Sequence, residues 1–141
     1  MHEYWKGRCR GRTMPARADI DPADLKALLP NLMIYQVDGP DLYSLRLVGS
    51  AIVAFVGQDF TGKVAGSAMT AEAKHALYEL LGDIVRTQTP RFRAGKAFWW
   101  QEKNYREYEA CFLPLSTDGK SVNQILVGTK FDLTPEKPPR P

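Results

Sequence analysis

The clearest periodic pattern in the chain is an apolar stripe between residues 70 and 87. Apolar side chains recur there three or four residues apart, at Ala73, Leu77, Leu80, Leu81 and Ile84. This spacing places them on one face of a helix, while charged residues fill the opposite face. The sequence therefore predicts an amphipathic helix over 70–87 that packs on a core through this stripe.

Shorter apolar and alternating segments predict strands. In residues 42–49, Tyr43, Leu45 and Leu47 alternate with polar residues, which is typical of a strand with one buried face. A turn signal at 117–120 separates the last two segments. Strands are expected near 31–38, 42–49, 91–100, 104–115 and 121–131.

The segment before the first strand carries signals for the start of a helix. Asp21 is suited to cap the first turn, because its carboxylate can accept the free backbone amides there. Pro22 follows at the first helical position, where it costs no hydrogen bond. Ile20 and Leu25 have the spacing of a hydrophobic staple. A helix is therefore expected over 22–29.

Two further short helices complete the expected order. Residues 3–10 can form a helix that docks through Tyr4 and Trp5. Ser50 is expected to cap a helix over 51–56. The order is then two strands, a short helix, the long helix and three strands.

The composition is that of one soluble domain. The chain has 141 residues, 44% of them hydrophobic and 25% charged, which is enough for a real core. Apolar runs of membrane-spanning length are missing, and the basic N-terminus lacks the apolar segment of a signal peptide. Cys9 and Cys111 have no metal or CxxC spacing, so they are expected to be free thiols in the cytoplasm.

Two segments resemble a known family. Residues 14–32 read MPARADIDPADLKALLPNL, which resembles the run MPARxDIDPxDIxxLLP that opens members of a bacterial PAS-like family, PAS family 5. Residues 57–63 are similar to that family's GxDxTGK. The resemblance extends from about Tyr4 to about Leu133.

The resemblance implies an α+β fold. It is a PAS-like five-stranded antiparallel sheet with helices packed on one face and an N-terminal helical extension. Residues 1–30 would form the extension, residues 31–133 the PAS-like domain, and residues 134–141 a mobile proline-rich tail.

The resemblance also implies a stand-alone sensory or protein-interaction domain in bacterial signalling, without catalytic output. Such a domain must pass on its state by contact, so a homodimer or a signalling-protein partner is expected. One alternative is a sensor of a small molecule or haem. A weaker alternative is a nucleic-acid-binding module.

In the PAS fold a ligand sits between the sheet and the helices. Candidate lining residues are Leu45, Leu47, Phe55, Phe60, Leu77, Leu81, Phe92, Trp100 and Cys111. They are predominantly apolar, so they suit a small apolar or planar ligand, and they equally suit a filled core.

Neither haem nor flavin is expected as a cofactor. Flavin PAS domains carry a reactive cysteine in a motif similar to GRNCRFLQ, and Phe60 stands at that position here. Haem PAS sensors hold iron through a histidine on the long helix. His75 lies on the predicted helix, but about 160° from Leu77 at ~100° per residue, so it points to the polar side and pairs with Glu79.

Aromatic residues outside the predicted core suggest an interface. Tyr4 and Trp5 precede the capped helix, and adjacent Trp99 and Trp100 must face opposite sides of a strand. Tyr4, Trp5 and Trp99 are therefore candidate interface residues. Residues 1–12 are expected to pack across a sheet surface, either their own or that of a second chain.

Other classes of site find weak support. The segment 57–64 nearly matches a phosphate-binding loop, but Val64 replaces the Ser or Thr that would hold magnesium. No GxSxG or HExxH motif is present, and no metal site is expected. Basic and aromatic residues interleave over 91–106, but acidic neighbours favour a solvated mixed face over a nucleic-acid surface.

Overall fold

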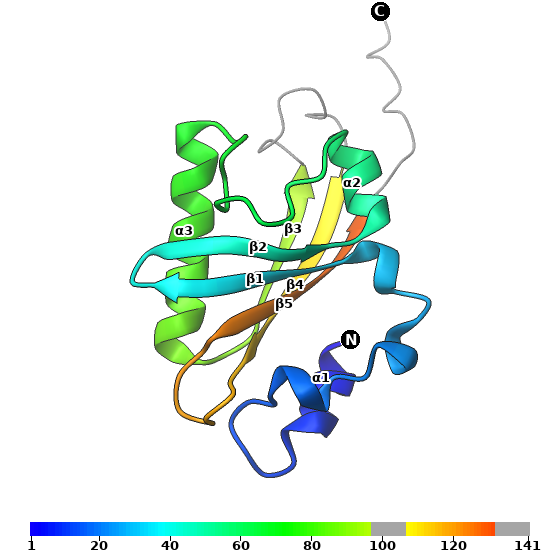
Figure 1. Ribbon diagram of the computed structural model, residues 1–141, viewed down its shortest axis with the longest axis vertical. Helices are drawn as coiled ribbons and strands as arrows, with labels where there is room; N and C mark the ends of the chain where they lie inside the picture. Colours follow the sequence, from blue (N-terminus) through cyan, green and yellow to red (C-terminus); the bar gives the residue numbers. More distant parts are fainter. Residues whose placement is uncertain (97–106, 132–141) are drawn as a thin grey trace, which may run out of the picture.

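The computed structural model describes residues 1–96 and 107–131 and contains a five-stranded antiparallel sheet in the order β2-β1-β5-β4-β3 (Figure 1). The strands are β1 Leu32–Gly39, β2 Leu42–Val48, β3 Arg91–Lys96, β4 Glu107–Leu115 and β5 Gln124–Phe131. The α-helices are α1 His2–Cys9, α2 Ser50–Val56 and α3 Ala71–Thr87. The expected fold class and the order of its elements are thereby confirmed.

The helix α3 confirms the apolar stripe. The hydroxyl of Thr70 caps it by accepting the amide of Ala73 at 3.2 Å. Gln88 ends it in the left-handed conformation, with a φ of 58°. Of the stripe, Leu77 is half-buried and the other four residues are buried. The helix thus packs on the sheet through the face that the sequence predicts.

The strand β2 contains an irregularity that the alternating pattern does not reveal. Leu45 lies opposite Tyr35, whereas Leu47 lies opposite the next residue of β1, Ile34. Arg46 is therefore an extra residue in the ladder, as in a β-bulge. The expectation that Leu45 and Leu47 share one face is wrong, because the extra residue reverses the alternation between them.

The helix expected over 22–29 is instead two short 3-10 turns, Pro22–Leu25 and Leu29–Asn31. Asp21 does cap the first turn, since its carboxylate accepts the amide of Ala23 at 2.9 Å. Leu28 is 42% exposed, so a longer helix would have little apolar face to bury.

The start of α2 also differs from expectation. Ser50 is the first helical residue, and Gly49 occupies the cap position without a side-chain cap. A Cβ at Gly49 would lie 2.3 Å from the carbonyl oxygen of Pro30, so only glycine fits where the two segments touch. This close approach, rather than a serine cap, sets where α2 begins.

The N-terminal arm, residues 1–31, packs on the sheet of its own chain (Figure 1). Trp5 is buried, and its indole N–H donates to the carbonyl oxygen of Pro114 at 2.8 Å. The hydroxyl of Tyr4 donates to the carboxylate of Asp24 at 2.7 Å. Two of the three candidate interface residues therefore make contacts within the chain, while Trp99 lies outside the described residues.

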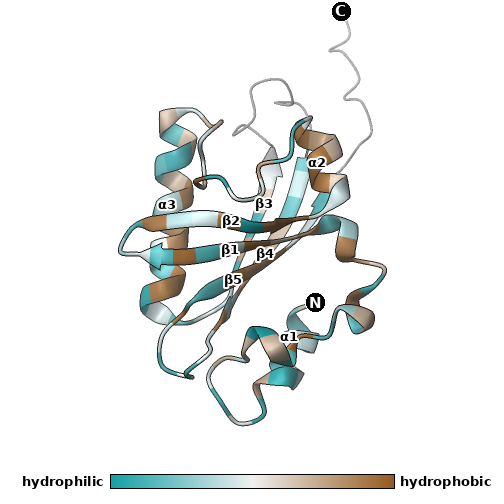
Figure 2. Ribbon diagram, in the orientation of Figure 1, coloured by the Kyte–Doolittle hydropathy of each residue, from teal (hydrophilic) through white to brown (hydrophobic). Residues whose placement is uncertain are grey.

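Most of the buried apolar residues form one cluster that spans both faces of the sheet, and Ile52, Phe55 and Ala73 lie outside it. Figure 2 shows apolar residues concentrated along α2 and the central strands. No helix among the described residues is long and apolar enough to cross a membrane. Residues 134–141, the expected tail, lie outside the described part of the chain.

Candidate functional site

A cavity of about 320 Å³ lies between the sheet and the helices α2 and α3. Its walls are predominantly apolar and come from all five strands, from α2 and α3 and from the loop between these helices; Met33 of β1, Ile52 of α2, Ala73 of α3 and Phe112 of β4 are among them. This volume is at the lower end of the range of roughly 300–1,000 Å³ for small-molecule sites.

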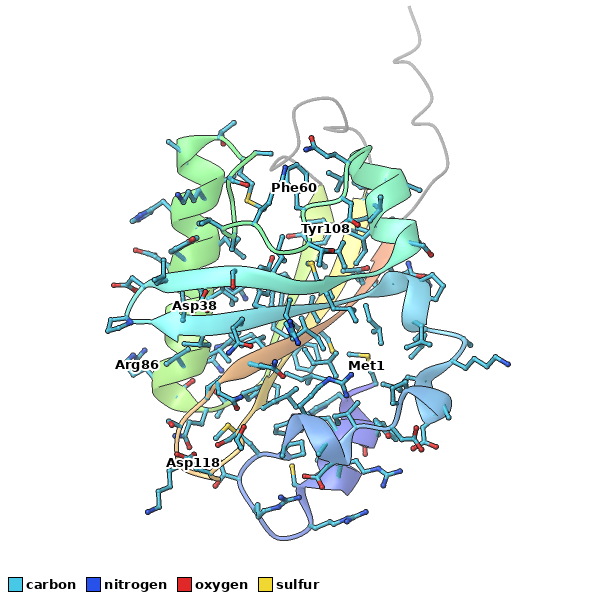
Figure 3. The ribbon with its side chains drawn as sticks, in the orientation of Figure 1. Met1, Asp38, Phe60, Arg86, Tyr108 and Asp118 are labelled. Atoms are coloured by element: carbon cyan, nitrogen blue, oxygen red, sulfur yellow. The ribbon has the colours of Figure 1, made fainter. Side chains whose placement is uncertain are left out.

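Three of the predicted lining residues meet at this cavity. Leu45 reaches it from β2, Leu77 from α3, and Phe60 from the loop after α2. Figure 3 shows Phe60 near Tyr108 of β4, between α2 and α3 and away from the N-terminal arm.

Three other predicted residues lie on the opposite face of the sheet. The bulge at Arg46 turns Leu47 there, into a shallow apolar hollow beside the N-terminal arm. Phe92 is 54% exposed and its ring meets the ring of His2 edge-on at 5.3 Å. Cys111 lies opposite Phe92 in the ladder, one residue out of phase with the lining residues of β4. Placing these three at the cavity is wrong, because a shift of one residue exchanges the two faces of a strand.

The remaining predicted residues do not line the cavity either. Leu81 is fully buried in the core against the sheet. Phe55 is buried, and its ring stacks on the ring of Phe131 at 4.1 Å between centroids. Trp100 lies outside the described residues.

Several lining residues were missed by the sequence analysis. Met33 and Tyr35 alternate on β1, and Tyr108, Ala110 and Phe112 alternate on β4. The alternation was present in the sequence as a signal. Only the register of the ladder shows which of the two sets faces the helices.

Tyr35 is the most deeply placed polar residue of the lining. Only 3% of the residue is exposed, yet its hydroxyl is not among the described buried atoms that lack a hydrogen-bond partner, so the hydroxyl opens onto the cavity that Tyr35 lines. Burial raises the pKa of its phenol, and the neighbouring phenols of Tyr78 and Tyr108 raise it further. Tyr35 is therefore a neutral hydroxyl at all ordinary pH values.

Arg93 of β3 is the charged residue among the described residues that line the cavity. It is exposed, and one guanidinium nitrogen donates to the carbonyl oxygen of its neighbour Phe92 at 3.0 Å. No described carboxylate forms an ion pair with it. The cavity therefore meets solvent beside a positive charge.

The expected position of His75 is confirmed. Its side chain is 76% exposed and pairs with Glu79, with 3.1 Å between Nε2 and Oε1. Neither histidine and neither cysteine lines the cavity. The described residues hold no group of three His, Cys, Asp or Glu side chains placed to bind a metal.

The surface considered for nucleic acid is described only in part. Arg91 lies between β3 and the end of α3, where its guanidinium contacts the hydroxyls of Thr87 and Thr89. Lys103 and Arg106 lie outside the described residues. Arg91 thus makes local contacts between the start of β3 and the end of α3.

A cavity between an antiparallel sheet and helices on one face suggests a comparison with sensor folds. The family model described as PAS domain matches residues 1–129. The chain belongs to the PAS domain family. The matched range includes the N-terminal arm as well as the sheet of this PAS domain. No curated protein matches the chain.

Solved PAS structures share the fold at low sequence identity. The PAS domain of Bordetella pertussis BvgS is 17% identical, with a TM-score of 0.57 over 79% of this chain and 85% of that one. A domain of an HTR-like protein from Haloarcula marismortui ATCC 43049 is 16% identical, with a TM-score of 0.53 over 73% and 96%. A light-oxygen-voltage domain studied with a flavin analogue is 12% identical, with a TM-score of 0.53 over 78% and 82%.

Proposed function

We propose that this PAS domain is a sensory domain whose input is a small molecule bound in the cavity between the sheet and α2 and α3. The observation that carries this proposal is the cavity itself, which remains after the stripe of α3 has packed on the sheet. A filled core would support the alternative, a protein-interaction domain without a ligand.

The output of the domain is a contact and not a reaction. No pair of acid, base or nucleophile groups lines the cavity among the described residues, which supports a role without catalysis. We expect the contact to be a homodimer or a complex with a signalling protein in the cytoplasm. Sedimentation velocity over a range of concentrations tests the homodimer.

The cavity lining supports a ligand other than haem or flavin. No histidine lines it to hold iron, and no cysteine lines it to form a flavin adduct. The expected absorption spectrum of the freshly purified chain is that of its aromatic residues alone. A Soret band or a flavin spectrum that persists through gel filtration would contradict this prediction.

The proposed function is tested by filling the cavity. Ala73 is buried and lines it, whereas Ala71, two residues earlier in the same turn of α3, is exposed. Native mass spectrometry of the chain purified from bacterial cells should show a bound small molecule. Ala73→Leu should lose that molecule, and Ala71→Leu should keep it. An empty chain, or equal occupancy in both variants, would contradict a ligand in this cavity.

A further inference from the structure

Two polar side chains stand out in the apolar wall of the cavity, and they come from opposite sides of it. Tyr35 lies on β1 and Arg93 on β3, and both line the cavity. In the sheet order β1-β5-β4-β3 three strand spacings separate them, which is roughly 14 Å across the sheet at about 4.8 Å per spacing. The register adds an offset along the strands, because Tyr35 is level with Pro114 of β4 and Arg93 with Ala110, which is roughly 13 Å at about 3.3 Å per residue. The two groups therefore define two polar ends of an apolar space.

The inner end is set by Tyr35. Its hydroxyl has no hydrogen bond to a described residue and is not among the buried atoms that lack a partner, so it is open to the cavity. An occupant that pairs with it therefore gains a hydrogen bond. Tyr35 stays a neutral phenol, and burial of a charged group beside it in the apolar interior is costly, so a neutral oxygen is the favoured partner. The inner end is therefore suited to a hydroxyl or carbonyl group.

The outer end is set by Arg93. Its guanidinium is the charged group among the described lining residues, and no described carboxylate forms an ion pair with it. A planar guanidinium binds a carboxylate through two parallel hydrogen bonds, whereas a protonated amine in the same place is repelled. The outer end therefore selects an anionic head group.

We infer that the ligand is a small elongated carboxylic acid. Its carboxylate meets Arg93, its apolar body spans the cavity, and an oxygen at its far end meets the hydroxyl of Tyr35. This inference rests on the proposed function, because it names the class of ligand for the same cavity. The apolar body matches the predominantly apolar walls, to which the strands between the two residues also contribute Thr129 and Tyr108.

Isothermal titration of the full chain with three probes of equal chain length tests this class. The probes are 8-hydroxyoctanoate, octanoate and 1-octanol. We expect affinity to fall in that order, by roughly threefold or more at each step. Octanoate lacks the far oxygen that meets Tyr35, and 1-octanol exchanges the charge-assisted contact of the carboxylate with Arg93 for a weaker neutral contact of its hydroxyl with Tyr35.

Two variants assign the two contacts. Arg93→Gln should weaken both acids about tenfold and leave 1-octanol unchanged. Arg86→Gln, which removes an exposed arginine of α3 outside the cavity, should leave all three affinities unchanged. Tyr35→Phe should abolish the advantage of 8-hydroxyoctanoate over octanoate, while Tyr43→Phe, a buried tyrosine outside the lining, should preserve it.

Two results would overturn the inference. One is equal affinity for octanoate and 1-octanol, and the other is an affinity for the two acids that does not change in Arg93→Gln. The proposed function is judged separately by the molecule that copurifies. If Ala73→Leu removes that molecule and none of the probes binds, the domain remains a ligand sensor and the ligand is not an elongated acid.

Discussion

At the scale of single residues, short polar side chains fix the turns that join the larger elements. Asp118 is the clearest case. Its carboxylate accepts the amide of Lys120 at 2.8 Å, the amide of Ser121 at 3.0 Å and the hydroxyl of Ser116 at 3.0 Å. These bonds, led by the amide of Ser121, lower its pKa to about 2. The turn between β4 and β5 thus depends on an ionised carboxylate.

The lowered pKa of Asp118 makes a prediction about acid. The contribution of the carboxylate to folding is fully present above its ordinary pKa of 3.8 and is lost as the pH falls toward about 2. Asp118→Asn has no such titration. Denaturant midpoints of the chain and the variant, measured from pH 7 to pH 2, should therefore converge below pH 4. A difference that is constant over this range would contradict the role of Asp118.

Asp21 supports a second prediction at this scale. It caps the turn Pro22–Leu25 through the amide of Ala23. Asp21→Ala should lower the free energy of unfolding by about 1 kcal/mol, the usual value for such a cap. Lys26→Ala, at an exposed neighbouring position, is the control and should have little effect. An unchanged denaturation midpoint in Asp21→Ala would show that the cap is not needed.

At the scale of elements, the apolar stripe of α3 could be predicted because its packing depends on spacing within one segment. The faces of the strands could not, because a face is set by pairing with another strand. Arg46 shows this most clearly. Nothing in the local sequence marks it as an extra residue, yet it sends Leu45 to the cavity and Leu47 away from it.

The helix α1 depends on one buried hydrogen bond. Trp5→Phe keeps most of the apolar contact but leaves the carbonyl of Pro114 without its indole donor. A buried carbonyl without a partner costs about 1–3 kcal/mol, so the free energy of unfolding should fall by that amount. Chemical denaturation measures it. A loss that is no larger than for Tyr4→Phe, whose hydroxyl bond is exposed, would contradict this reading.

At the scale of the whole molecule, other parts of the chain cover both faces of the sheet. The helices α2 and α3 enclose the cavity on one side, and the N-terminal arm covers the other. The sequence predicted both layers, because each has its own apolar residues. It could not predict that Trp5 would contact its own chain and not a second one, since the same side chain suits either.

Removal of residues 1–12 tests the role of the arm. The truncated chain loses the burial of Trp5, and an aromatic truncation in a core costs about 3–5 kcal/mol. Its midpoint in denaturant should fall accordingly. Sedimentation should show more association than for the full chain, since an apolar face is uncovered. Equal stability and equal mass of the two chains would show that the arm does not protect this face.

Gly128 connects these layers through thermodynamics. A Cβ at this position would lie 2.8 Å from the sulfur of Met1, while the next residue of β5, Thr129, lines the cavity. Docking of the N-terminal arm and binding of a ligand in the cavity therefore both involve residues of β5. Coupling between two such equilibria is reciprocal, so docking of the arm changes ligand affinity by the same factor by which the ligand changes docking. Gly128→Ala displaces the flexible end of the Met1 side chain, and a change of ligand affinity in this variant would reveal such coupling. The ligand affinity of Gly128→Ala, compared with that of the unchanged chain, therefore reports whether the two faces of the sheet are thermodynamically coupled.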